Sequence, residues 1–448
     1  MTSYLLEHAL LPSGVADDVL VTVEDGRWTA VAPAGDGPWT GQRIGGLTIP
    51  GLANCHSHAF HRALRGRTQT GLGSFWTWRE QMYAVADRLD PDSYYRLARA
   101  TYAEMVAAGI TSVGEFHYLH HQPDGRPYDD PNAMGRALIQ AARDAGIRIA
   151  LLDTCYLASG IGKPPEGVQR RFSDGDADAW AGRVSDLDKL DHRGDVVVGA
   201  AIHSVRAVPR DQLGRIAEWS RQARPPGQGR PLGGPLHVHL SEQVAENEQC
   251  LAAYGLTPTQ ILEEAGALGD QTSVVHATHL TATDVETLGR AGTYACFCPT
   301  TERDLGDGIG PSRQLHDGGA RLTLGSDSHA VIDPFEEMRA VELDERLATQ
   351  ARGHWSAGEL MDAATTTGHA SLGFADAGAI AVGHRADLVT LDLASPRTAG
   401  AGSTIEAAVF AAAAGDVRRV MVDGNVVFDG DVAQVGADLD RAIREIWR

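Results

Sequence analysis

Short apolar segments alternate with longer amphipathic stretches through most of this 448-residue chain. Stretches such as 94–108, 131–145, 211–224 and 336–349 carry apolar residues at helical spacing, which predicts a helix in each. Eight strand and helix units in series favour an α/β fold with a closed, TIM-like (β/α)8 barrel. A doubly wound open sheet is the alternative, but no G-x-G-x-x-G motif follows any apolar segment. The predicted strands are the segment before His56 and segments 111–116, 147–152, 196–202, 236–239, 273–276, 293–297 and 321–324.

Both ends of the chain, 1–48 and 380–448, consist of short apolar segments separated by turn residues. Segments such as 19–23 and 417–428 are rich in valine and include or precede an Asp-Gly turn signal. Strand-rich ends can pair with each other, so we expect a small β-sandwich domain built from both termini. The catalytic barrel would then comprise residues 49–379. The alternative is two unrelated terminal hairpins.

Charge and cysteine content limit the partners of the chain. A net charge of −20 disfavours nucleic acid and anionic membranes as partners, and a pocket for an anionic substrate must supply its own arginines and histidines. The first residues lack a basic region, and no segment approaches about eighteen uninterrupted apolar residues, so neither an export signal nor a membrane span is expected. Five scattered cysteines argue against a disulfide framework and predict a reducing, cytoplasmic location.

Polar residues follow the end of nearly every predicted strand. In a (β/α)8 barrel the carboxyl ends of the strands converge on one mouth, where enzymes of this fold carry out their chemistry. Histidines placed by chance would scatter over helices and loops as well. The candidates are His56 and His58; Glu115, His117 and Tyr118; Asp153; His203 and Arg206; His239 and Glu242; His276 and His279; Thr300, Glu302 and Arg303; and Asp327 and His329.

The pair His56 and His58 is the first of these groups. Side chains two residues apart in a strand lie on one face about 6.5–7 Å apart, so both imidazoles can bind one metal ion at about 2.0–2.1 Å. With 18 histidines in 448 residues, roughly one such pair is expected by chance. The histidines and carboxylates that follow the other strands favour a metal site over a chance pair.

The combination of H-x-H after the first strand, H-x-x-E after the fifth, histidine after the sixth and Ser-Asp after the eighth resembles the amidohydrolase superfamily of metal-dependent deaminases. The resemblance covers essentially the whole chain, and it implies that Glu242 and His276 handle protons and orient the electrophile. No lysine ends the fourth strand, where binuclear members carry a bridging carbamylated lysine, so one metal ion is expected. The implied metal ligands are His56, His58, His239 and Asp327.

A narrower resemblance is carried by segments 75–83, 114–121, 203–206, 299–308 and 325–329. They are similar to those of the formimidoylglutamate deiminases within this superfamily. This resemblance implies hydrolysis of N-formimino-L-glutamate to N-formyl-L-glutamate and ammonia in histidine degradation. His61 stands where we expect a glutamine among the substrate contacts. Either its imidazole takes over that hydrogen bond, or the substrate preference differs.

The residue types support this chemistry by themselves. Zn2+ held by three imidazoles and a carboxylate lowers the pKa of its bound water toward neutrality, although nitrogen and oxygen ligands also suit Fe2+ or Mn2+. Asp327 can accept the proton of the attacking water, and Glu242 is placed to protonate the leaving nitrogen. His276 can donate a hydrogen bond that fixes the attacking water.

A glutamate substrate brings two carboxylates, which require positive charge and hydrogen-bond donors. Arg206, His203 and Tyr118 follow predicted strands, and Arg79 lies in the expected long loop after the first strand. Arginine offers the bidentate fit that a carboxylate prefers. Together with His61 these are the predicted substrate-binding residues. The alternative for Arg79 is a surface ion pair with Glu80 or a charge at the end of a helix.

Two other functions stay open from the sequence. A deaminase acting on a nucleobase or another ring amidine, such as guanine, would share the metal ligands but would read its substrate with aromatic and amide side chains. A catalytically silent scaffold would have lost ligands, whereas this chain keeps a complete set. Whatever the function, a homodimer is expected, because long barrels of this kind often dimerise.

Overall fold

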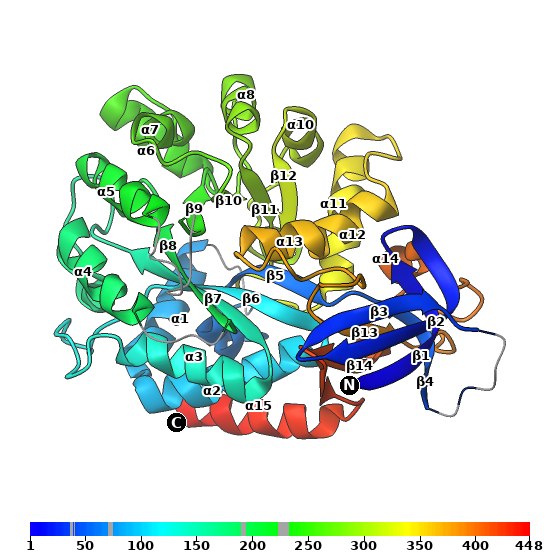
Figure 1. The fold of residues 1–448 in the computed structure, drawn as a ribbon. Coiled ribbons are helices and arrows are strands. Elements are labelled where there is room, and N and C mark those ends of the chain that lie inside the picture. Colours follow the sequence, from blue (N-terminus) through cyan, green and yellow to red (C-terminus); the bar gives the residue numbers. More distant parts are fainter. Residues whose placement is uncertain (36–38, 40, 70–74, 190–193, 223–232) are drawn as a thin grey trace.

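The computed structural model describes residues 1–448 except 36–38, 40, 70–74, 190–193 and 223–232, and at 75 and 76 it describes the backbone alone. Its centre is a sheet of eight parallel strands that follow one another in chain order (Figure 1). All eight predicted strands are present within a few residues of their expected bounds. They are β5 (Leu52–Ser57), β6 (Ile110–His117), β7 (Arg148–Cys155), β8 (Val196–Ile202), β9 (Leu236–Leu240), β10 (Thr272–His276), β11 (Tyr294–Phe297) and β12 (Arg321–Leu324).

The first and last strands of this sheet meet and close it into a barrel. The carbonyl oxygen of His56 accepts hydrogen bonds from the backbone N–H groups of Ser326 at 3.1 Å and Asp327 at 3.0 Å. The backbone N–H of His58 donates to the carbonyl oxygen of Asp327 at 3.2 Å. The predicted (β/α)8 barrel is therefore confirmed, and its closing seam lies beside the predicted metal ligands.

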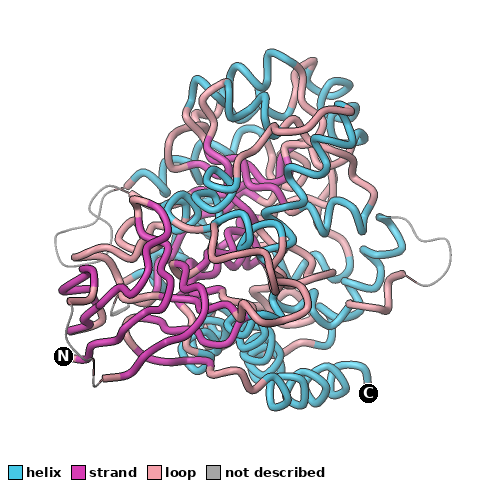
Figure 2. Tube along the Cα trace, turned by 90° about the vertical axis from the view of Figure 1, so that its right-hand side faces the viewer, coloured by secondary structure: helices cyan, strands magenta, loops and turns pink. Residues whose placement is uncertain are grey.

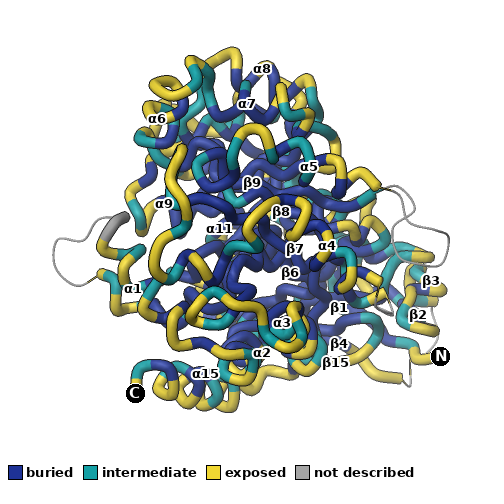
Figure 3. The backbone as a smooth tube through the Cα atoms, turned by 90° about the vertical axis from the view of Figure 1, so that its left-hand side faces the viewer, coloured by how far each residue is buried: buried dark blue, intermediate teal, exposed yellow. Residues whose placement is uncertain are grey.

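Helices surround the barrel, and their inner faces complete its core (Figure 3). Helix α8 shows the local signals, because the Thr281 side chain caps its first turn and Gly292, at φ +65°, ends it. The helices are η1 (Ala59–Leu64), α1 (Phe75–Arg88), α2 (Pro91–Ala107), α3 (Ala133–Ala145), η2 (Gly167–Phe172), α4 (Ala177–Asp188), α5 (Arg210–Arg221), α6 (Val244–Tyr254), α7 (Pro258–Glu264), α8 (Ala282–Ala291), α9 (Pro299–Leu305), α10 (Ser312–Asp317), α11 (Pro334–Thr349), α12 (Ala357–Ala364) and α13 (Thr366–Ser371).

A second sheet, beside the barrel, contains strands from both termini, as predicted (Figure 2). Its order is β15-β14-β13-β4-β1-β2-β3, and β4 pairs with β1 from the N-terminal part and with β13 from the C-terminal part. The seven strands form one continuous sheet whose two ends face each other, as in the predicted sandwich, because Val21 and Trp28 share a buried core with Met421. They are β1 (Thr2–Leu11), β2 (Gly14–Glu24), β3 (Arg27–Pro33), β4 (Gln42–Ile49), β13 (Leu388–Leu391), β14 (Val417–Val422) and β15 (Asn425–Phe428).

Buried charge joins this sheet to the barrel. Arg148, at the start of β7, donates to both carboxylate oxygens of Asp387, which immediately precedes β13. The C-terminal part also contains helices, and one of them, α15, packs along α2 of the barrel (Figure 1). The division into domains at residues 48 and 380 therefore stays a prediction. These helices are α14 (Ile405–Phe410), η3 (Ala414–Asp416) and α15 (Val432–Trp447). Among the described residues, no helix has the length and apolar character needed to cross a membrane.

Candidate active site

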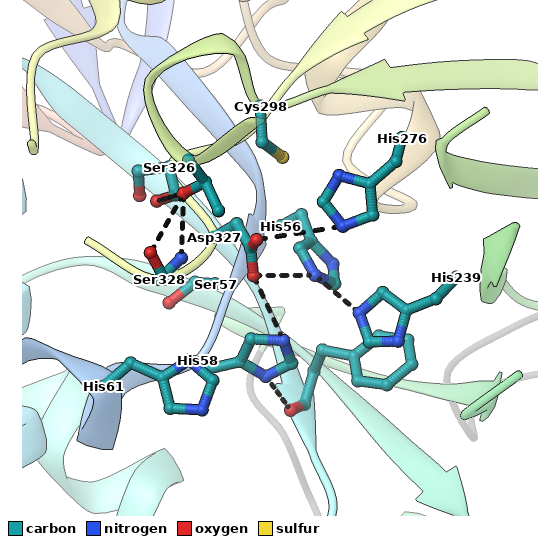
Figure 4. A network of polar contacts seen from close by, with 12 residues as sticks. His56, Ser57, His58, His61, His239, His276, Cys298, Ser326, Asp327 and Ser328 are labelled. Atoms are coloured by element: carbon teal, nitrogen blue, oxygen red, sulfur yellow. Dashed lines mark hydrogen bonds and ion pairs between the residues drawn. The ribbon is translucent and has the colours of Figure 1, made fainter. Parts of the chain in front are cut away.

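Three histidines and one aspartate meet at the carboxyl end of the barrel (Figure 4). His56 and His58 come from the end of β5, His239 from β9 and Asp327 from the turn after β12. The Nε2 atoms of His56 and His239 lie 3.1 Å apart, and Asp327 Oδ1 lies 3.4 Å from His56 Nε2 and 3.3 Å from His58 Nε2. Two ligands at about 2.0–2.1 Å from one tetrahedral ion lie about 3.3 Å apart, so this spacing suits a single metal ion.

Hydrogen bonds behind the cluster fix two of the imidazole rings. The Nδ1–H of His58 donates to the carbonyl oxygen of Phe116 at 2.9 Å, and the Nδ1–H of His239 donates to that of His203 at 2.9 Å. Each bond places the proton on Nδ1 and leaves Nε2 free to act as a ligand. The donor set therefore fits a divalent cation that prefers nitrogen and oxygen.

Burial sets the protonation of the cluster. Burial lowers the pKa of His56 to about 4 and holds the pKa of His239 well below its usual value, so both imidazoles are neutral near neutral pH. Burial alone would raise the pKa of Asp327, but contacts with His56 and His58 outweigh it and hold that pKa well below the usual range. Neutral imidazoles with one carboxylate are the forms that bind a metal ion.

The turn after β12 needs an unusual backbone to deliver Asp327. Asp327 has φ +39°, and His276 at the end of β10 has φ +69°, both in the left-handed region. A Cβ at Gly325 would lie 2.7 Å from the Cβ of His56 and 2.9 Å from the Sγ of Cys298. The glycine therefore lets the turn approach β5, and the surrounding packing holds two strained residues at the site.

Two groups suited to proton transfer face the cluster. The Nε2 of His276 lies 3.8 Å from Asp327 Oδ2, and its Nδ1–H donates to Glu302 Oε1 at 3.3 Å. Burial lowers the pKa of His276, but the hydrogen bond with Glu302 and the charges of Glu242 and Asp327 outweigh it and hold that pKa well above its usual value. The second group is Glu242, which is buried and lines a cavity together with His276 and Asp327.

One cavity joins the cluster to all five residues predicted for substrate binding. Arg206 follows β8, and its Nη2 lies 3.8 Å from Glu242 Oε2. Arg79 lies in α1, a helix that packs against η1 and η2. The prediction that Arg79 lies in a long loop is therefore wrong. Burial, with the nearby charge of Arg206, holds the pKa of His203 well below its usual value, so the positive charge of the wall comes from the arginines. The five residues are His61, Arg79, Tyr118, His203 and Arg206.

His61, where glutamine is expected, has a defined partner. Its Nε2 lies 2.9 Å from the hydroxyl oxygen of Tyr118, and its ring packs 5.1 Å from that of Trp78. Burial holds the pKa of His61 well below its usual value, so the ring is neutral. The imidazole therefore takes part in the cavity wall as a hydrogen-bonding group without charge.

Three buried residues support the site although the sequence assigned them no role. Glu302 holds His276, as described above. Glu115 accepts hydrogen bonds from Ser57 Oγ and the backbone N–H of Ala59, both at 2.7 Å. His329 lies 3.1 Å from Ser57 Oγ and 3.0 Å from Ser326 Oγ. Glu302 and His329 follow predicted strands and Glu115 lies near the end of one, and these positions were the only signal the sequence offered. The other open histidine, His279, is half-buried, and its backbone N–H donates to Ser241.

A second group of possible ligands lies nearby, formed by His117, His120 and Asp153. Arg183 donates to both oxygens of Asp153 at 2.9 and 2.8 Å, and the Nε2–H of His120 donates to a backbone carbonyl at 2.9 Å. A guanidinium already neutralises this carboxylate. This group is therefore a buried ion-pair network and does not suit a metal ion.

Comparison with known proteins identifies the family to which this fold belongs. The model of the amidohydrolase family matches residues 47–427, which include the whole barrel. The chain belongs to the amidohydrolase family. A crystal structure of an amidohydrolase from Brucella melitensis superposes on this amidohydrolase with a TM-score of 0.90 at 31% identity, covering 100% of both chains. Family and fold are thus as the sequence predicted.

Relatives of known activity extend over nearly the full length of this amidohydrolase. It is 37% identical over 445 residues to the formimidoylglutamate deiminase of Pseudomonas aeruginosa, covering 96% of this chain and 95% of that protein. It is 28% identical over 417 residues to the 5-methylthioadenosine/S-adenosylhomocysteine deaminase of Natronomonas pharaonis, covering 92% of this chain and 88% of that protein. Both relatives are deaminases, and they act on different substrate classes.

Proposed function

We propose that this amidohydrolase converts N-formimino-L-glutamate and water into N-formyl-L-glutamate and ammonia. The observation that carries the proposal is one cavity in which the metal-type cluster faces a wall containing Arg79 and Arg206. A dicarboxylate needs such local positive charge, because the chain as a whole has a net charge of −20. The 37% identity to a formimidoylglutamate deiminase supports the same substrate.

We infer one divalent metal ion at this site, Zn2+ in the first instance, with Fe2+ and Mn2+ as alternatives. When bound, the ion supplies a water molecule whose pKa is lowered toward neutrality. The strand β8 ends at Ile202, followed by His203, so no lysine is available there to bridge a second ion. The residues that would hold the ion are His56, His58, His239 and Asp327.

The remaining chemistry falls to the chain's own acids and bases. As the water oxygen bonds to the formimino carbon, Asp327 accepts the proton that the water loses. The formimino group is bound in its protonated form, –CH=NH2+, so one proton from protonated Glu242 to the terminal nitrogen lets the bond between that nitrogen and the formimino carbon break and release neutral ammonia. As the formyl carbonyl forms, the remaining hydroxyl proton passes to the Glu242 carboxylate, and Asp327 gives its proton to solvent, which restores both acids. His276, held by Glu302, donates a hydrogen bond that orients the attacking oxygen.

The residues of the cavity outside the metal-type cluster would bind the glutamate part of the substrate. Arg206 and Arg79 present guanidinium groups that can bind carboxylates in a bidentate way. His203, Tyr118 and His61 add uncharged hydrogen-bonding groups around them. Arg79 and Arg206 line the cavity and are separate from the metal-type cluster, so substrate recognition and metal binding fall to different residues.

The direct test is ammonia release by zinc-loaded protein. Turnover of N-formimino-L-glutamate is expected to exceed that of guanine, cytosine, adenosine and 5-methylthioadenosine, with chelated protein as the inactive control. Preference for a nucleobase or nucleoside would overturn the proposal.

A ring deaminase is the second candidate, favoured by the 28% identity to a methylthioadenosine deaminase. The variant Arg206→Ala separates the two. Loss of a partly buried charge pair costs a dicarboxylate substrate about 30-fold or more in kcat/KM, whereas a neutral ring should lose little. The third alternative, a catalytically silent scaffold, would bind no metal ion and would show no activity after Zn2+ is added to the purified protein.

Assembly and location also remain proposals. We propose a homodimer, which light scattering of the purified protein can test, and no nucleic-acid partner, in keeping with the acidic charge. A reducing cytoplasmic location is supported by five cysteines that are all buried and free.

A further inference from the structure

A buried carboxylate lies behind the arginine of the cavity wall. Glu246, in the first turn of α6, is 1% exposed, and within the described part of the chain neither of its carboxylate oxygens has a hydrogen-bond partner. Its Oε2 lies 3.6 Å from the Nε of Arg206, a nitrogen that is itself buried and without a hydrogen bond. Burial raises the pKa of Glu246 to about 7, although the charge of Arg206 opposes the rise. The charge of Glu246 therefore depends on Arg206.

Arg206 lies between two carboxylates that face different spaces. Glu242 approaches its Nη2 at 3.8 Å from the inner cavity, which also holds the metal-type cluster. Glu246 approaches its Nε and lines an outer groove, together with Arg79 and Arg206 itself. Both distances exceed those of hydrogen bonds, so these are ion pairs that leave the guanidinium donors uncommitted. One cation thus balances an acid proposed for proton transfer and an acid outside the reaction.

We propose that Glu246 is a positioning residue that holds the Arg206 guanidinium away from Glu242. A cation shared by two anions moves toward whichever charge remains. Without the charge of Glu246, Arg206 would pair with Glu242 in the free enzyme, and the substrate carboxylate would have to compete for it. At saturation the bound carboxylate draws Arg206 back. The inference rests on the proposed function.

The signature is a change in KM without a matching change in kcat. In the zinc-loaded enzyme, Glu246→Gln is expected to raise the KM for N-formimino-L-glutamate about tenfold, the value of one charged contact, while kcat falls less than about threefold. The inhibition constant of glutarate, a dicarboxylate without a reacting group, should rise by the same factor. Glu248→Gln removes an equal charge from an exposed position of the same helix and should leave all three quantities within about twofold of wild type.

A double variant shows whether Glu246 acts through Arg206. In an Arg206→Gln background, Glu246→Gln should raise KM no further, because the group that it positions is gone. Additive effects, an unchanged KM in Glu246→Gln, or equal losses in KM and kcat would overturn the inference. Glu246→Asp keeps the charge and should show a smaller rise in KM, which provides a test if the glutamine variant folds poorly. Absence of turnover by the wild type would overturn the proposed function instead.

Discussion

The ion pair between Arg148 and Asp387 supports a quantitative prediction about stability. Both side chains are 1% exposed, and Arg148 Nη1 also lies 3.2 Å from Asp423 Oδ1. Removing one partner of a buried pair costs about 3–5 kcal/mol, because the other charge stays buried without compensation. We expect Asp387→Asn near the lower end of this range, since Asp423 remains beside the guanidinium.

The expected change in melting temperature follows from chain length. An unfolding entropy of about 2.1 cal/mol/K per residue gives about 0.9 kcal/mol/K for 448 residues that unfold together. The variant Asp387→Asn, at about 3 kcal/mol, should therefore melt about 3 °C below wild type in scanning calorimetry.

A matched exposed pair provides the control. Arg96 and Glu445 also join the barrel to the C-terminal part, but their side chains are 45% and 50% exposed. Exposed pairs contribute about 0.2–1 kcal/mol, so Glu445→Gln should lower the melting temperature by about 1 °C or less. Equal shifts in the two variants would refute the reasoning that burial decides the cost.

Three further predictions concern the site and the same ion pair. Glu242→Gln should lower kcat about 10²–10⁴-fold with an unchanged melting temperature, and near-wild-type kcat would remove Glu242 from the mechanism. Chelation should abolish turnover, and Zn2+ at about 100 times its dissociation constant should raise the melting temperature by about 3 °C; no shift would argue against a site in the folded state. Burial raises the pKa of Asp387, but Arg148 outweighs it and holds that pKa below the unfolded value, so the stability contribution is complete above about pH 4 and declines below. The difference in melting temperature between wild type and Asp387→Asn should therefore shrink in acid, and a constant difference would contradict this origin.

The barrel was predictable because its strands are buried on both faces. Strand β8 reads as a continuous apolar run, and its observed bounds are those expected. The order of polar residues after those runs then predicted which side chains share the mouth. The parallel pairing of β1 with β4 was not predictable in this way, because both strands are only partly buried and carry weaker patterns, and their partners lie far apart in the sequence.

The supporting contacts of the site were beyond sequence reasoning. Glu302 and Glu115 lie 26 and 58 residues from the groups they hold, His276 and Ser57. Which buried carboxylate meets which imidazole or hydroxyl depends on side-chain packing between strands. The same holds for Glu246, whose helical position alone suggests an ordinary first-turn acid.

The position of β4 has a consequence for how the chain reaches its final state. This strand leads through Pro50 and Gly51 directly into β5, and its other neighbour, β13, is made more than 300 residues later. During synthesis from the N-terminus, one edge of β4 therefore stays open until β13 has been made. Shortened chains that end before β13 would keep that edge exposed and should self-associate through it. The pairing of β4 is thus completed only after every strand of the barrel has been synthesised.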